Sequence, residues 1–225
     1  MVKTFPEKDK TWRDLICFPM IYYVISLFFV VLLFAISPEY LADYEKLNTV
    51  LYSAVFITHW LLAFLVIRRL KKQDLPLKEF IAPRKKTRVF PAILVFVSLN
   101  ALFTAYMVLA LTYVRIQPWR NLNAFQLVYF VAAQPLTAGF VEELIWRGYF
   151  IEKLLRIGNS EWRSIIFSSI SFAFIHGFWV VDKLAVTFLF GIVAGAYYVR
   201  ERNLVVLMVT HVTLDIIAFA LAFLA

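Results

Sequence analysis

The sequence predicts an all-α membrane protein, a polytopic helical bundle with about seven transmembrane helices. Three observations support this fold class. Hydrophobic residues make up 62% of the chain, whereas an average soluble domain is about 45–50% apolar. The mean hydropathy is +0.77. Apolar runs also recur along the whole chain, most of them near the ~20 residues that a helix needs to cross a bilayer.

The expected spans follow one another with short connections. In chain order they are Leu15–Ile36, Thr49–Ile67, Val89–Val114, Ala124–Leu155, Trp162–Val181, Leu184–Tyr198 and Leu204–Ala225. The first is too long for the apolar core of a cleavable signal peptide. The fourth is overlong and charged in its second half, and Pro135 is expected to kink it or to mark a re-entrant break. The sixth is short for a span.

The distribution of Lys and Arg predicts the orientation of these spans. Eighteen basic residues fall in the N-terminal tail and in the second, fourth and sixth connections, and nine of them lie in the segment 68–88. The other connections hold Lys46, Arg115, Arg120 and Lys183. Because basic connections stay on the cytoplasmic side, we expect a multi-pass protein of the plasma (inner) membrane with its N-terminus inside and its C-terminus outside.

The same distribution excludes nucleic acid as the partner that the net charge of +8 suggests. The basic residues cluster at the ends of spans, where topology sets them, and the segment 68–88 is expected to lie on anionic membrane lipids. Cys17 is the single cysteine of the sequence, so no internal disulfide can form.

Six ionisable residues fall inside the predicted spans of the second half of the chain. They are Glu142, Glu143, Arg147, His176, His211 and Asp215. Each charge placed at the middle of a bilayer costs about 2.5–3.5 kcal/mol even on the most lenient scale. Such residues usually face a partner or a wet cavity, so this group is the candidate functional site.

Two adjacent carboxylates are expected to occupy different environments. On a helix, Glu143 and Arg147 are four residues apart and share a face, which predicts an ion pair. Glu142 is turned by about 100° and is left in a low-dielectric pocket, as a general base requires. The alternative is a structural ion-pair cluster at a helix end near the membrane interface.

Two histidine motifs complete the candidate site. His176 is expected deep in its span, with Phe172 one turn before it and Gly177 beside it, where a backbone or a substrate can approach closely. His211 and Asp215 are four residues apart, so the carboxylate can fix the tautomer of the imidazole. The alternative for His176 is a buried neutral histidine bonded to the backbone. The alternative for His211 and Asp215 is a polar pair that only bonds internally and packs against another helix. His59, the third histidine, is interpreted as a packing or helix–helix hydrogen-bonding residue.

The ordered motifs EExxxR (Glu142, Glu143, Arg147), FxxxH (Phe172, His176) and HxxxD (His211, Asp215) resemble the CPBP (Abi) family of CAAX-protease and bacteriocin-processing membrane enzymes. Its best-known members are type II CAAX prenyl endopeptidases. The resemblance covers residues 124–225, the expected catalytic helices. Residues 1–123 resemble the family only as N-terminal membrane helices with a basic cytoplasmic loop. The compact length is similar to that of bacterial CAAX-protease-related proteins found beside exosortase systems.

The resemblance implies a glutamate-dependent intramembrane peptidase. Glu142 and His176 would activate a water, His211 and Asp215 would stabilise the oxyanion, and Glu143 and Arg147 would brace the site. Phe172 and Gly177 would contact substrate. The prenyl endopeptidases typically carry Asn where this chain has Asp215, and an ionised carboxylate cannot donate to an oxyanion. We therefore expect His211 to be the donor and Asp215 to orient it.

These observations predict an endopeptidase whose buried site opens toward the cytoplasmic half. It would cut near a lipidated or hydrophobic terminus of a prenylated or exported substrate. No resident cofactor is expected. Catalytic Zn²⁺ is a disfavoured alternative, because the HExxH motif is absent and Glu143 is expected to be ion-paired with Arg147. One non-catalytic alternative is a membrane scaffold, or an immunity or sorting-system accessory protein, in which the polar core is structural. Another is a transporter in which the cluster is a proton relay.

Overall fold

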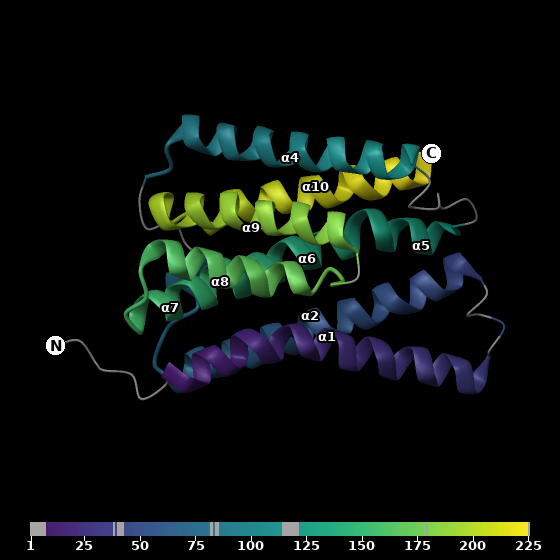
Figure 1. The fold of residues 1–225 in the computed structure, drawn as a ribbon, viewed down its shortest axis with the longest axis horizontal. Coiled ribbons are helices and arrows are strands. Elements are labelled where there is room, and N and C mark those ends of the chain that lie inside the picture. The colour runs from purple at the N-terminus through teal and green to yellow at the C-terminus, as the bar shows by residue number, and fades with distance from the viewer. Residues whose placement is uncertain are drawn as a thin grey trace.

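Long helices that run back and forth along one common axis form the bundle (Figure 1). The structure is a computed structural model that describes residues 8–37, 39, 43–81, 83, 86–113, 122–178 and 180–224. The helices are α1 (Lys8–Ile36), α2 (Tyr44–Lys72), α3 (Lys78–Ile81), α4 (Val89–Thr112), α5 (Ala124–Val128), α6 (Gln134–Glu142), α7 (Glu152–Arg156), α8 (Glu161–Phe174), α9 (Val181–Glu201) and α10 (Leu204–Leu224). No strand occurs in these ranges, so the all-α fold class is confirmed.

Six helices in the described ranges are long and apolar enough to cross a membrane. They are Lys10–Ile36, Glu45–Lys72, Val89–Thr112, Ala124–Arg156, Val181–Glu201 and Leu204–Phe223. These helices make the chain a multi-pass integral membrane protein. The helix α1 begins at one end of the bundle and α10 ends at the other (Figure 1).

The predicted span Trp162–Val181 is wrong as a continuous helix. Its helical part, α8, has 14 residues and is therefore about 21 Å long, shorter than the ~30 Å of a bilayer core. His176 consequently lies beyond the end of α8 instead of deep within a helix, in a turn where Gly177 has a φ of 101°. The following helix, α9, has 21 residues and is longer than the expected Leu184–Tyr198.

The fourth span is helical throughout, without the re-entrant break considered for Pro135. A π-helical segment, Tyr129–Ala133, joins α5 to α6 just before the proline. The proline lacks the N–H that an α-helix needs at this point, and a local π-helical turn is a known way to accommodate such a gap. A second π-helical segment, Glu143–Ile151, joins α6 to α7 and carries the charged motif.

Small residues let α8 pack closely against its neighbours. A Cβ built on Gly191 of α9 would lie 2.7 Å from the Cβ of Ser169 on α8, so the two helices touch at backbone distance. On the opposite face of α8, Ser171 donates to the carbonyl of Leu15 and accepts from the indole of Trp146 at 3.1 Å. These contacts hold the helix that leads into His176.

Charged side chains join the helices at one end of the bundle. Arg69 of α2 donates to Asp14 of α1, and Arg202 donates to Glu152 of α7. Arg88, just before α4, is ion-paired with Glu201 at the end of α9. At this end α1 begins, α2 ends, α4 begins and α9 meets α10 (Figure 1). We call it the basic end, because most Lys and Arg residues of the sequence fall in its connections.

Gly191→Leu should destabilise the protein by about 1–3 kcal/mol, because the new side chain must displace Ser169 in a packed core. Thermal unfolding of the purified protein in detergent would measure this. Val193→Leu is the matched control, since Val193 lies on the same helix but is 38% exposed. Equal unfolding temperatures for both variants would contradict the close α8–α9 contact.

Candidate active site

Glu142, the last residue of α6, is the carboxylate at the centre of the cluster. It is 4% exposed. Its Oε1 lies 2.8 Å from Nε2 of His59 on α2, 83 residues earlier in the sequence. Its Oε2 is buried without a hydrogen-bond partner in the structure. One oxygen is therefore held by a hydrogen bond, and the other is not.

Two imidazole nitrogens face this second oxygen. Nε2 of His176 lies 4.0 Å from Oε2 of Glu142, and Nε2 of His211 lies 3.8 Å from it. Nδ1 of His176 lies 3.1 Å from the carbonyl of Phe172. A carbonyl only accepts, so this contact makes Nδ1 the protonated nitrogen, and neutral His176 presents Nε2 as an acceptor.

Glu143 binds a different part of the cluster from Glu142. Its Oε1 accepts from Nη1 of Arg147 at 3.0 Å and from Nδ1 of His211 at 2.8 Å. The expected Glu143–Arg147 pair is confirmed. The expected orienter, Asp215, lies 3.8 Å from Nε2 of His211, whereas Glu143 holds Nδ1.

Arg147 is buried as a stacked cation. It is 1% exposed, and its guanidinium lies 4.2 Å from the ring centroid of Phe172 and 5.1 Å from that of Phe190. Both rings also pack near the imidazole of His211. Phe172 therefore supports the charged cluster as well as lining the cavity described below. Gly177 is not among the described residues that line it.

His59 is a residue of the site that the sequence interpretation left outside it. The interpretation as a helix–helix hydrogen bond holds, but the bond is to Glu142 itself. His59 is fully buried, and its ring packs at 5.5 Å from that of Tyr22. The sequence does contain one feature that could have pointed to His59. Like the six candidate residues, it is an ionisable side chain deep in an apolar span. No motif spacing links it to α6.

The cluster lies in the wall of a cavity of about 500 Å³. The titratable residues that line it are Tyr22, Tyr52, His59, Tyr106, Glu142, His176, Asp182, Lys183, His211 and Asp215. Apolar walls come from residues such as Phe103 and Phe219. The cavity extends along the first turns of α2 and the last turns of α10, away from the basic end. We expected the site to open toward the half that carries the basic connections, and the lining residues extend toward the other half.

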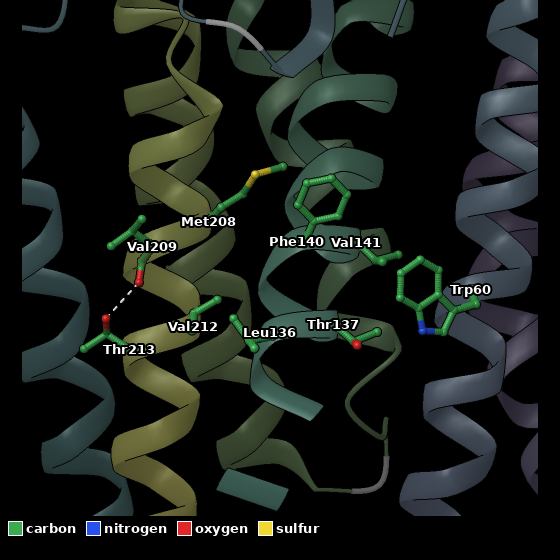
Figure 2. Close-up of a pocket in the computed structure, with 9 residues that line it drawn as sticks. All are labelled: Trp60, Leu136, Thr137, Phe140, Val141, Met208, Val209, Val212 and Thr213. Carbon is green, nitrogen blue, oxygen red and sulfur yellow. Dashed lines mark hydrogen bonds between the residues drawn. The ribbon is translucent and has the colours of Figure 1, made fainter. Parts of the chain in front are cut away.

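A second cavity, of about 560 Å³, lies on the other face of α6 (Figure 2). Trp60 of α2, Phe140 and Val141 of α6 and Met208 of α10 contribute to its lining. No ionisable side chain is among its lining residues, and several of them are exposed apolar residues. It is a groove on an exposed apolar side of α6, separate from the charged cluster.

The side chains of the cluster already bind one another in ways that compete with a metal. Oε1 of Glu142 is taken by His59, and Oε1 of Glu143 by Arg147 and His211. Across the described part of the chain, no group of three or more His, Cys, Asp or Glu side chains has an arrangement that could hold a metal ion.

Comparison with protein families identifies this part of the chain. Residues 124–217 match the family model described as type II CAAX prenyl endopeptidase Rce1-like. These residues are similar to this family. The resemblance drawn from the motifs is thereby confirmed for these residues, and an intramembrane protease activity is supported in general terms. Neither the curated proteins nor the solved structures contain a match to the chain.

Within this Rce1-like segment, Arg147→Met should destabilise the protein by about 3–5 kcal/mol, because it leaves Glu143 buried beside His211 without its cation. The double variant Glu143→Gln with Arg147→Met should recover much of this loss, since the neutral amide keeps an acceptor for His211. Monodispersity and thermal unfolding in detergent report both effects. A double variant no more stable than the single one would contradict the pairing.

Proposed function

We propose that the protein is an intramembrane endopeptidase that uses Glu142 and His176 to activate a water. The observation that carries the proposal is the oxygen Oε2 of Glu142, buried without a partner and within 4.0 Å of two imidazole nitrogens. The match of residues 124–217 to a family of endopeptidases supports the same reaction class.

The water would bind between Oε2 of Glu142 and Nε2 of His176, both of which accept hydrogen bonds in the forms described above. Glu142 takes one proton as the oxygen attacks the scissile carbonyl, and the proton then passes to the leaving amine. His59, which donates to Oε1, fixes the carboxylate in the orientation that leaves Oε2 facing the cavity. His59 is thus a positioning residue in this mechanism.

The oxyanion would be stabilised on the α10 side of the cavity. Glu143 holds Nδ1 of His211, so Nε2 points toward Glu142 and Asp215. As an imidazolium, His211 donates from Nε2 to the developing negative charge. Asp215, 3.8 Å from that nitrogen, can donate when protonated. Arg147 holds Glu143, and no metal takes part in any of these steps.

The substrate is a polypeptide, cut near a hydrophobic or lipidated terminus. The cavity combines apolar walls with the polar cluster, which suits an apolar tail beside a hydrolysable bond. The matching family is described as prenyl endopeptidases, and the peptide panel below tests whether this protein accepts a prenylated terminus. The other partners are membrane lipids, and nucleic acid is not one. We place the protein in the plasma membrane with a cytoplasmic N-terminus.

Glu142→Gln should lower peptide hydrolysis by about 10²- to 10⁴-fold, the usual contribution of a general base, while the protein remains folded. A panel of prenylated and unprenylated peptides, assayed with purified protein in detergent, would measure this. Glu161→Gln is the matched control, because Glu161 is an exposed residue in the first turn of α8. A Glu142→Gln protein with full activity would favour a non-catalytic scaffold, and loss of activity in chelator with recovery in Zn²⁺ would favour a metal site.

His59→Phe should lower kcat by about 10- to 100-fold with little change in KM, because a hydrogen bond to a charged group contributes about 1.5–3 kcal/mol. His59→Gln, which keeps a donor in reach of Glu142, should recover part of the loss. Steady-state kinetics on the best peptide of the panel would separate the two parameters. A loss confined to KM would place His59 in substrate binding instead.

A further inference from the structure

The cavity that contains the catalytic cluster and the basic connections of the chain lie at opposite ends of the bundle. By sequence, the connections of the basic end contain eighteen of the Lys and Arg residues, of which Lys3, Arg84 and Lys85 lie outside the described residues, and the opposite connections contain four. Arg115 and Arg120, two of these four, lie outside the described residues. Basic connections remain on the cytoplasmic side of a membrane. The basic end is therefore the cytoplasmic end.

The residues that line the cavity lie between the cluster and the other end. Asn48 and Tyr52 are in the first turns of α2, and Asp182 and Lys183 are in the first turn of α9. Ala218, Phe219 and Ala222 are in the last turns of α10. Figure 1 shows that α2 begins, α9 begins and α10 ends toward the same end of the bundle.

The bundle is closed on the cytoplasmic side of the cluster. Trp146 and Phe150 follow Glu142 in the direction of the basic end, and Leu207 lies one turn before His211 on α10. Trp146, Phe150 and Leu207 are 0% exposed and belong to one hydrophobic core. Beyond them, the ion pairs of Asp14, Glu152 and Glu201 join the ends of neighbouring helices. A peptide cannot pass this layer without separating packed helices.

Exposure within the cluster rises in the same direction. The side chain of Asp215, one turn closer to the end of α10 than His211, is 21% exposed, against 5% for His211. The side chain of His176, which precedes α9, is 19% exposed, against 6% for Glu142. Both groups that face the outer part of the cavity are the more accessible ones.

We infer that substrate reaches the catalytic cluster from the exoplasmic side of the membrane. The substrate is then a polypeptide segment presented at the outer face, such as an exported or membrane-anchored chain. A lipidated C-terminus held at the cytoplasmic face cannot reach the site. The inference rests on the proposed peptidase function for its substrate, and on the cavity and the charge distribution for its direction.

Site-directed labelling tests the direction without requiring activity. In a Cys17→Ser background, single cysteines are introduced by Ala218→Cys in the outer part of the cavity and by Arg163→Cys in the exposed first turn of α8 at the basic end. A charged maleimide that does not cross the ~30 Å hydrocarbon core is added to right-side-out and to inverted membrane vesicles. We expect Ala218→Cys to be labelled in right-side-out vesicles and unlabelled in inverted ones, and the reverse for Arg163→Cys. The opposite pattern for Ala218→Cys overturns the inference.

A second measurement separates this inference from the proposed function. Unlipidated peptides that cannot cross the bilayer are supplied to either side of sealed vesicles that contain the protein or its Glu142→Gln variant. Glu142-dependent cleavage of peptide on the exoplasmic side supports the inference. Such cleavage only on the cytoplasmic side overturns it and leaves the peptidase standing. Absence of cleavage on both sides, with Ala218→Cys still labelled from outside, supports the direction of the cavity and overturns the peptidase.

Discussion

The hydrogen bond between His59 and Glu142 is the contact on which the arrangement of the site depends. It joins α2 to the end of α6 in the interior of the bundle, where both side chains are nearly inaccessible. A buried carboxylate without partners is costly, and this bond satisfies one oxygen while leaving the other to face two imidazoles. The N-terminal helices are therefore part of the site, although the family match begins only at residue 124.

Glu143, the neighbouring carboxylate, has several partners. Glu143 is fully buried, and one of its oxygens binds both a guanidinium and an imidazole. The guanidinium is covered by aromatic rings, which lowers the cost of holding a cation away from water. A charged network of this kind restricts the orientation of its members. The geometry of His211 follows from this network, and Asp215 is left on the cavity side of the imidazole.

The two ends of the bundle differ in a way that gives the site a direction. Packed aromatic and aliphatic side chains, with ion pairs outside them, close the basic end. Toward the other end, helices α2, α9 and α10 leave a cavity with polar residues along its length. Water and an extended peptide have the same requirement, a path lined by groups that replace lost hydrogen bonds. Among the described residues, the polar lining of such a path lies toward the second end.

Local features of the sequence were enough to predict the fold class, most of the helices and most residues of the cluster, because hydropathy over ~20 residues and spacing on one helix are local properties. The Glu143–Arg147 pair is of this kind. The tertiary structure alone decided that α8 stops at Phe174, that His59 binds Glu142, that Glu143 and not Asp215 holds His211, and that the cavity points away from the basic end. Each of these depends on contacts between residues far apart in the chain, which no local spacing encodes.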